Sequence, residues 1–517
     1  MSDSDHKETK AAANGLAADE MELARMGYKQ ELNRELGLMQ NFGVSFSIIS
    51  VITGIPSLFL YGLNTGGPAV MVWGWVVVSI FTMLVGLAMA EVCSAHPTSG
   101  GPYFWAAMLS EPKDAPLASW ITGWFNLLGQ VAVTTGISFG CATFLSTACT
   151  LKTGFVPTPN TTIGIYAAVL AAQGTINTFG VHILHYLNNI SVWWHAIGMA
   201  PTHQSGTFVF KTFLDGTGGW GDRASHVYVA VIGILMAQYT LTGMTEETKN
   251  AAMSGSIGII MAIGVSAVLG WFLILGLLFS IQDLDRTLDS ETGQPVAQIF
   301  LDTVGENGAI VLMVIVVGAM FFCGTFSITS NSRMMFAFAR DGGIPGHKFF
   351  NYVNAKWKSP IRTVWLACFL SFCLGLPSLG SSVAFAAATS IATIGLYISY
   401  AIPIALRVIY RKKFVRGPFH LGVFSYPVAL AAVIWIAFIS IVFILPQVNP
   451  VTSQTFNYSI VAVGIVIFYS VGFWLISARK WFTGPVKQIA AEEMGINVME
   501  PSEALKFEEK RSKENSA

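Results

Sequence analysis

The residues in this chain best suited to hold a small solute are Thr53, Gly54 and Ile55, in the middle of the first long apolar run. Gly54 has the weakest helix propensity after proline. Pro56 cannot donate a backbone N–H and clashes with the carbonyl four residues earlier. Inside a membrane, a broken helix leaves bare backbone groups that persist only where protein, water or a ligand pairs with them. The interruption is therefore either a packing kink or a binding site, and N–H groups of a helix restarting near Ile55 could hold a carboxylate.

A second apolar run ends in a similar way. It closes with Gln238-Tyr-Thr-Leu-Thr-Gly243, and its Leu-Thr-Gly resembles the Ile-Thr-Gly of residues 52–54. The two runs are five apolar runs apart, and paired interruptions in two five-helix halves indicate a secondary transporter built from inverted repeats. This pairing favours the binding site over the kink and adds Thr242 and Gly243 to the candidate substrate-binding residues. It predicts a small, largely zwitterionic substrate between two halves that rock.

The composition indicates a membrane protein. Of 517 residues, 53% are hydrophobic and 11% charged, with a mean hydropathy of +0.58, whereas about a quarter of the residues in a soluble chain are charged. The net charge of zero argues against a nucleic-acid partner. The six cysteines lack metal-ligand spacing, and no nucleophile has a neighbouring base. The sequence thus predicts no enzyme activity, no metal site and no cofactor.

The apolar runs predict an all-α polytopic protein with about twelve transmembrane helices. A permease domain at 41–481 would lie between an N-terminal tail at 1–40 and a C-terminal tail at 482–517, both cytoplasmic. The segment from Arg340 to Arg362 is rich in lysine and arginine, which places it in the cytoplasm. The expected spans are 44–64, 69–93, 116–148, 162–180, 183–199, 227–243, 255–281, 308–338, 362–378, 381–407, 424–445 and 458–478.

Several long motifs resemble one known family. They are Ala90-Glu-Val-Cys-Ser-Ala-His-Pro-Thr-Ser-Gly-Gly-Pro-Tyr-Phe-Trp105, Trp120-Ile-Thr-Gly-Trp-Phe-Asn126, Met244-Thr-Glu-Glu-Thr-Lys-Asn-Ala251 and Ser330-Asn-Ser-Arg-Met-Met-Phe-Ala-Phe-Ala-Arg-Asp-Gly-Gly-Ile-Pro345. Together they resemble the amino acid/choline transporter family of the amino acid–polyamine–organocation superfamily, which includes GABA and choline permeases. The resemblance implies a leucine-transporter-type fold of two inverted five-helix repeats plus two helices. It also implies import of amino acids or amines, usually with protons.

The resemblance carries over to few positions. Thr53, Gly54 and Ile55 match the family's unwound first helix, where backbone N–H groups hold the substrate carboxylate. Thr325 and Ser327 lie near where relatives place a coupling-cation site, so a cation or proton there is implied. The chain also departs from the family pattern: about six residues are missing between Gly243 and Met244, and about three helical turns are missing from the fifth span, near residues 198–200.

Three other polar residues within the spans have two readings each. Glu91 lies near the cytoplasmic end of the second span, where it is either a functional ionisable group or part of a structural salt bridge, and its shallow depth favours the salt bridge. Asn126 and Gln130, in the third span, must find partners within the bundle or contact the substrate.

Two functions remain open. The first is a secondary active, proton-coupled importer (a symporter) of amino acids or amines such as GABA or choline, in the plasma membrane or an endomembrane. The second is a transport-inactive or sensor-type homologue, because segments of the fifth and sixth helices are missing. Choline lacks a carboxylate and would need an aromatic cage, whereas GABA would use the helix N-terminus. The partners expected in either case are the small solute, a coupling ion and membrane lipid.

Overall fold

The computed structural model describes residues 46–97, 100–179, 204–220, 224–242, 251–354, 356–379, 383–411 and 414–485. Within these ranges the chain forms helices and no strand. The helices are α3 (Val51–Ser57), α4 (Phe59–Asn64), α5 (Gly67–Ala95), α6 (Pro102–Leu109), α7 (Ala115–Thr153), α8 (Pro159–Phe179), α10 (Gly206–Lys211), α11 (Ala224–Gly233), α12 (Leu235–Leu241), α13 (Ser256–Phe279), α14 (Leu284–Leu288), α15 (Pro295–Arg340), α16 (His347–Phe350), α17 (Ile361–Gly375), α18 (Ala384–Ile409), α19 (Ser425–Val442) and α20 (Ser459–Ile476).

The expectation of an all-α polytopic membrane protein is confirmed. Eight helical segments in the described ranges are long and apolar enough to cross a membrane, and 46–57 and 225–241 form shorter apolar helices. Of the twelve expected spans, 183–199 lies outside the described residues, and each of the others overlaps a helix. The tails at 1–40 and 482–517 also lie outside them, apart from 482–485.

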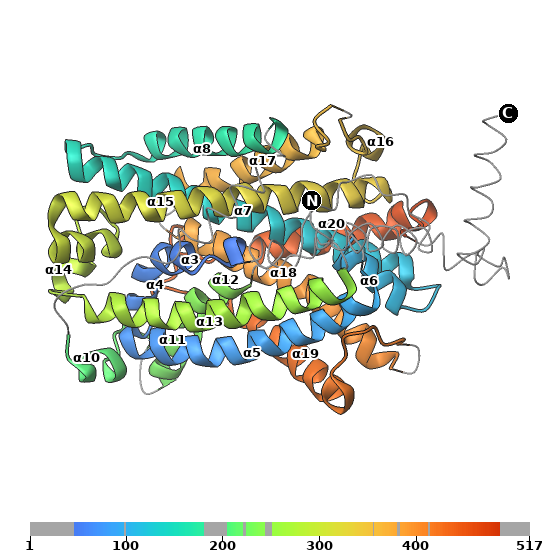
Figure 1. The fold of residues 1–517 in the computed structure, drawn as a ribbon, viewed down its shortest axis with the longest axis horizontal. Coiled ribbons are helices and arrows are strands. Elements are labelled where there is room, and N and C mark those ends of the chain that lie inside the picture. The colour runs from blue at the N-terminus through green and yellow to red at the C-terminus, as the bar shows by residue number, and fades with distance from the viewer. Residues whose placement is uncertain are drawn as a thin grey trace, which may run out of the picture.

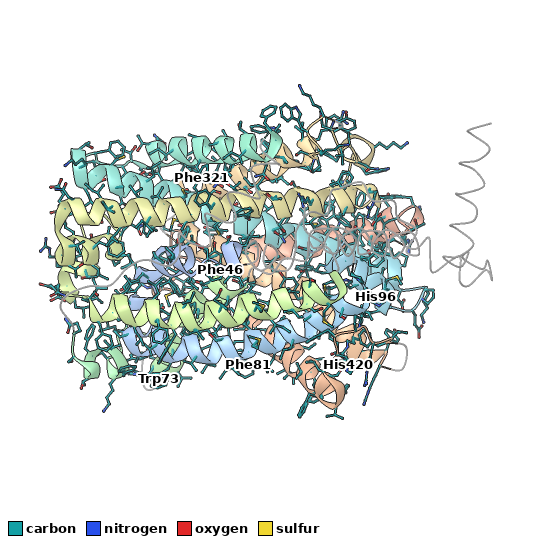
Figure 2. All side chains as sticks on the ribbon, in the orientation of Figure 1. Phe46, Trp73, Phe81, His96, Phe321 and His420 are labelled. Atoms are coloured by element: carbon teal, nitrogen blue, oxygen red, sulfur yellow. The ribbon has the colours of Figure 1, made fainter. Side chains whose placement is uncertain are left out.

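The long helices run side by side along one axis, and the short helices α3 and α4 lie between α15 and α13 (Figure 1). Helices of the first half contact helices five spans later: α3 packs on α12, α5 on α13, α7 on α15 and α8 on α17. A pseudo-twofold axis between two inverted five-helix halves brings such pairs together. The side chains fill the space between the helices, and Phe46 lies between α15 and α13 (Figure 2).

The bundle has two ends, and α15 reaches both of them (Figure 1). The inner end carries the segment from Arg340 to Arg362, which the lysine and arginine content predicts to be cytoplasmic. The outer end is the opposite one and carries the loop 282–294, with α14. The long helix α15 runs from the outer end to the inner end (Figure 1).

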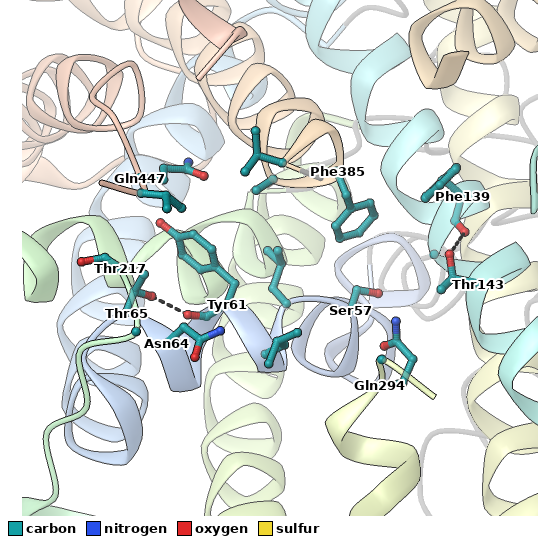
Figure 3. A pocket seen from close by; sticks show the side chains of 18 of the residues that line it. Ser57, Tyr61, Asn64, Thr65, Phe139, Thr143, Thr217, Gln294, Phe385 and Gln447 are labelled. Atoms are coloured by element: carbon teal, nitrogen blue, oxygen red, sulfur yellow. Dashed lines mark hydrogen bonds between the residues drawn. The ribbon is translucent and has the colours of Figure 1, made fainter. Parts of the chain in front are cut away.

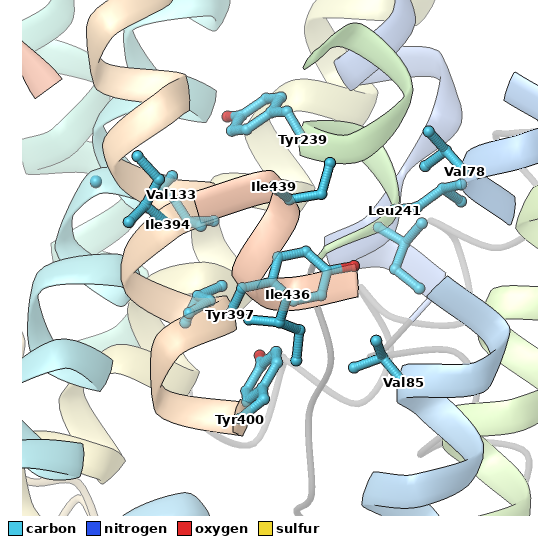
Figure 4. Close-up of a cluster of buried hydrophobic side chains, with 14 of the residues drawn as sticks. Val78, Val85, Val133, Tyr239, Leu241, Ile394, Tyr397, Tyr400, Ile436 and Ile439 are labelled. Atoms are coloured by element: carbon cyan, nitrogen blue, oxygen red, sulfur yellow. The ribbon is translucent and has the colours of Figure 1, made fainter. Parts of the chain in front are cut away.

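Part of the core lies between α5, α7, α12, α18 and α19, where buried apolar side chains such as Leu241, Ile394 and Ile436 meet (Figure 4). In a bilayer, burial of apolar groups against one another gains little over contact with lipid, so close packing and interhelical hydrogen bonds hold the helices together. Gln238 of α12 supplies several of these bonds. Its amide donates to the Tyr397 hydroxyl at 2.5 Å and to Thr82 Oγ1 at 3.3 Å, and accepts from Trp435 Nε1 at 3.1 Å.

Candidate functional site

The first span is interrupted at Ser50 rather than over 53–56. Residues 46–49 are helical, Ser50 has φ 27° and ψ 83°, and α3 then continues through Pro56 to Ser57. Leu58, with φ −111° and ψ 16°, separates α3 from α4. The expected discontinuity exists, but its expected position is wrong. A serine with positive φ is uncommon, and such strained positions concentrate at functional sites.

Thr53, Gly54 and Ile55 consequently lie inside α3. The N–H groups of Thr53 and Gly54 donate to the Ser50 carbonyl at 2.9 and 3.1 Å, and Thr53 Oγ1 donates to it at 2.8 Å. Since the helix restarts at Val51, the expected restart near Ile55 is also wrong, and these two N–H groups already have partners. Pro56 lies inside α3, one residue before its last residue, and supplies no N–H to the Ile52 carbonyl.

Gly54 has a packing role that the sequence did not reveal. A Cβ atom at Gly54 would lie 2.4 Å from Thr240 Oγ1 and 2.8 Å from Thr240 Cβ, closer than real Cβ atoms approach other atoms. The backbone of α3 therefore lies directly against α12. Small residues permit this kind of close helix contact in membranes. The two interrupted spans, which the sequence paired by their similar tripeptides, do touch each other.

The sixth span consists of α11 and α12, separated at Ile234. It ends at Leu241, and Thr242 follows as a fully buried cap whose Oγ1 donates to the Gln238 carbonyl. Gly243, and with it the apparent deletion before Met244, lies outside the described residues, as does the apparent deletion in the fifth span.

Tyr239 of α12 is a central residue that sequence reasoning missed. It is buried, and its hydroxyl has no hydrogen-bond partner among the described residues. A Cβ atom at Gly136 of α7 would lie 2.5 Å from that hydroxyl oxygen, so the phenol reaches from α12 to α7. The signal was present in the sequence: a phenol inside an apolar run, three residues before Thr242, is a polar group that needs a partner in the membrane.

Thr325 and Ser327 of α15 are both buried, but they point to different neighbours. Ser327 Oγ lies 2.8 Å from Thr134 Oγ1 of α7. Thr325 Oγ1 donates to the Phe321 carbonyl of its own helix at 2.8 Å. Cys323 of α15 contacts the first span on both sides of the interruption, since its thiol donates to the Ile48 carbonyl at 3.3 Å and lies 3.8 Å from Thr53 Oγ1.

A pocket of about 340 Å³ lies at the outer end, next to α3 and α4 (Figure 3). Its wall at Ser57 connects it to the interrupted helix, because Ser57 Oγ donates to the Thr53 carbonyl at 2.6 Å. Gly140 faces Ser57 from α7, one helical turn from Gly136 and so from the Tyr239 phenol. No side chain that lines the pocket is ionised. The side chains labelled in Figure 3 carry hydroxyls, amides or aromatic rings, and they are Ser57, Tyr61, Asn64, Thr65, Phe139, Thr143, Thr217, Gln294, Phe385 and Gln447.

Glu91 forms the salt bridge that its depth favoured. Its carboxylate lies 2.8 Å from Arg407 Nη2 of α18, and both side chains are buried. The Ser425 hydroxyl of α19 donates to both carboxylate oxygens, at 2.8 and 3.0 Å. This ion pair joins α5, α18 and α19 near the inner end. Among the described residues, no three histidine, cysteine, aspartate or glutamate side chains are grouped as metal ligands would be.

Comparison with known proteins places this arrangement in a family. The family model for amino acid permeases matches residues 37–468. The chain is 44% identical to the amino-acid permease BAT1 of Arabidopsis thaliana, over 91% of this chain and 96% of the relative. It is 45% identical to the BAT1 homolog of Oryza sativa, over 90% and 95%, and 31% identical to the GABA-specific permease of Saccharomyces cerevisiae, over 93% and 89%. This chain belongs to the amino acid permease family.

Proposed function

We propose that the protein is a secondary active importer of amino acids or related amines, coupled to protons, in the plasma membrane with both termini in the cytoplasm. One observation carries this proposal: an uncharged pocket at the outer end adjoins the interrupted helix α3, which packs on the sixth span. A solute entering that pocket would be one helical turn from Thr53 and from the Tyr239 phenol. Opening at the inner end would then release it.

The proposed solute contacts are Thr53, Gly54 and Ile55 of the first span and Thr242 and Gly243 of the sixth, together with Tyr239. Because the Thr53 and Gly54 N–H groups already donate to the Ser50 carbonyl, we assign the hydrogen bonds to the solute chiefly to the Tyr239 hydroxyl. Thr53 Oγ1, which also donates to that carbonyl, would take part as an acceptor. Thr325 and Ser327 remain the proposed residues for a coupling cation or proton on α15.

The pocket suits a solute with no net charge, because no lining side chain is ionised to balance an extra charge. A zwitterion such as GABA, which the name of the yeast relative specifies for that protein, fits this condition. The rings of Tyr61, Phe139 and Phe385 also line the pocket, and aromatic rings bind quaternary ammonium groups. GABA is therefore the first substrate to test and choline the second.

A transport-inactive or sensor-type homologue is the second candidate. The alignment with the Arabidopsis permease runs over 502 positions, although it includes only 91% of this 517-residue chain. The relative therefore has residues in the aligned region for which this chain has no counterpart. Segments missing from this chain would produce such unmatched residues. A protein that lost part of its sixth helix could still bind a solute without moving it.

The test is uptake of radiolabelled GABA, choline and basic amino acids by permease-deficient cells that express the chain, with and without a protonophore. We expect uptake of at least one solute and its loss with the protonophore. Solute-dependent signalling without any uptake would favour the sensor.

Tyr239→Phe removes a hydroxyl that has no described partner, so this variant should fold normally and lose solute affinity. Tyr166→Phe is the matched control, because the buried Tyr166 hydroxyl donates to the Ser371 carbonyl at 2.7 Å and Tyr166 lies outside the pocket lining. Unchanged affinity in a well-folded Tyr239→Phe variant would refute the role of Tyr239.

A further inference from the structure

A second polar group lies on α15, inward of the interruption. Asn331 is fully buried, and neither its amide nitrogen nor its amide oxygen has a hydrogen-bond partner within the described ranges. It follows Cys323 by eight residues and Ser327 by four, so the three side chains share one face of the helix. At 1.5 Å per residue, Asn331 lies about 12 Å further toward the inner end than Cys323.

The contacts of α15 with α7 show what faces Asn331. Ser327 pairs with Thr134, and the Phe338 ring packs on Gly123. In this antiparallel register, each step toward the inner end of α15 matches one step toward the N-terminus of α7. Asn331 is therefore level with Gln130. Gln130 shares the face of Gly123 and Thr134, being seven and four residues from them.

The two amides are therefore level with each other on α7 and α15, and the Asn331 amide has no hydrogen-bond partner among the described residues. A buried amide without a partner destabilises the fold, since its water contacts are lost and not replaced. Asn177 of α8 illustrates the usual arrangement in this bundle. Its Nδ2 donates to the Gln173 and Thr325 carbonyls at 3.0 and 2.9 Å, and its Oδ1 accepts from Thr329 at 2.5 Å.

We infer that Asn331, with Gln130 opposite, forms an inner subsite that binds the polar groups of the transported solute on its way to the cytoplasm. The inference rests on the proposed import function. A carboxamide both donates and accepts, so it can pair with the carboxylate and the ammonium group of a zwitterion. The subsite is distinct from the outer pocket, whose lining includes neither residue.

The experiment compares solute affinity on the two sides of the membrane. Half-saturating GABA concentrations are measured in right-side-out and inside-out vesicles that hold the wild type or Asn331→Leu, which keeps the branching of the side chain. We expect a rise of roughly tenfold in inside-out vesicles, corresponding to about 1.4 kcal/mol of binding free energy. The value for right-side-out vesicles should stay unchanged. If GABA is not carried, the same measurement is made with the solute that the uptake test identifies.

Thermal stability in detergent separates this role from a structural one. Asn331→Leu should melt at or above the wild-type temperature, because it removes an amide without partners, whereas Asn177→Leu, the matched control, should melt lower. Unchanged affinity on both sides, as expected for a bound water only, would overturn the inference. So would destabilisation comparable with that of Asn177→Leu. Absence of uptake by the wild type would instead reject the import function itself.

Discussion

Replacing Arg407 by methionine tests whether the buried ion pair near the inner end is structural. Arg407 lies 2.8 Å from Glu91, and the two side chains are 6% and 0% exposed. Methionine keeps most of the apolar stem and removes the charge. Among the described residues, the Glu91 carboxylate then retains the hydrogen bonds from the Ser425 hydroxyl.

The expected loss of stability is about 3–5 kcal/mol, the usual result of leaving one partner of a buried ion pair without the other. Glu91→Gln should cost less, since Arg407 keeps the Ser425 carbonyl at 3.2 Å and the Phe414 ring at 4.6 Å. The double variant Glu91→Gln/Arg407→Met should be more stable than Arg407→Met alone, because no buried charge is left unpaired.

The assay is unfolding of the purified variants in mixed micelles, followed by tryptophan fluorescence, together with solute uptake in cells. If the ion pair is structural, uptake should fall and rise with stability across the variants and should recover in the double variant. Equal stability of Arg407→Met and the double variant would refute the pairing argument. A stable double variant that has lost uptake would instead show that Glu91 has a functional role in transport.

Two further predictions concern packing and pH. Gly54→Ala should lower the free energy of unfolding by about 1–3 kcal/mol through overpacking against Thr240. Adding Thr240→Gly should recover part of that loss in the same unfolding assay. If the effects of the two substitutions simply add, the close contact of α3 with α12 is contradicted. Burial raises the pKa of the outer-end carboxyl of Asp215, but hydrogen bonds from the hydroxyl and N–H of Thr217 and from Ser225 outweigh it, so the folded-state pKa is lowered. The stabilisation by Asp215 is therefore complete above the unfolded-state pKa of about 3.9 and is lost as the pH falls through the folded-state pKa. Below about pH 4 the melting temperature should drop more steeply in the wild type than in Asp215→Asn. Parallel curves of melting temperature against pH would refute this prediction.

The sequence predicted the helical class and the positions of the spans other than 183–199, which lies outside the described residues, because membrane helices must be long and apolar. It also predicted that the first span is discontinuous and that it pairs with the sixth. The position that the sequence predicted for the interruption is wrong. Glycine and proline indicate where a helix is weak, but they do not show at which residue the folded chain interrupts it. Gly54 serves contact with Thr240, and Ser50 takes the unusual backbone conformation.

The side chains around the interruption were harder to predict. Cys323 resembled a small core residue, and nothing local distinguishes it from Cys368, which is also buried in the bundle. Only the three-dimensional contact with Ile48 and Thr53 identifies it. Tyr239 and Asn331 have visible polar groups in apolar runs, but whether such groups find protein partners depends on helices distant in the sequence.

The distribution of hydrogen bonds favours movement of the two interrupted spans as one unit. The helices α7, α8, α15 and α17 are joined by bonds between strong donors and acceptors: Ser138 to Gln173 at 2.8 Å, Asn177 to the Thr325 carbonyl at 2.9 Å and Tyr166 to the Ser371 carbonyl at 2.7 Å. The first and sixth spans are joined by Tyr61 and by the Gly54–Thr240 contact.

Between these two bodies, two of the described contacts of the first span are weak. They are the contact of the Cys323 thiol with Ile48 and Thr53, and that of Ser57 with Gly140. Thiols are weak donors and acceptors, and a glycine face presents no side chain to interlock. Rocking of one repeat against the other requires two firm bodies with a weakly bonded interface. The two weak contacts lie next to the outer pocket and the Tyr239 phenol, so a movement that opens the site there would separate a thiol contact and a glycine contact.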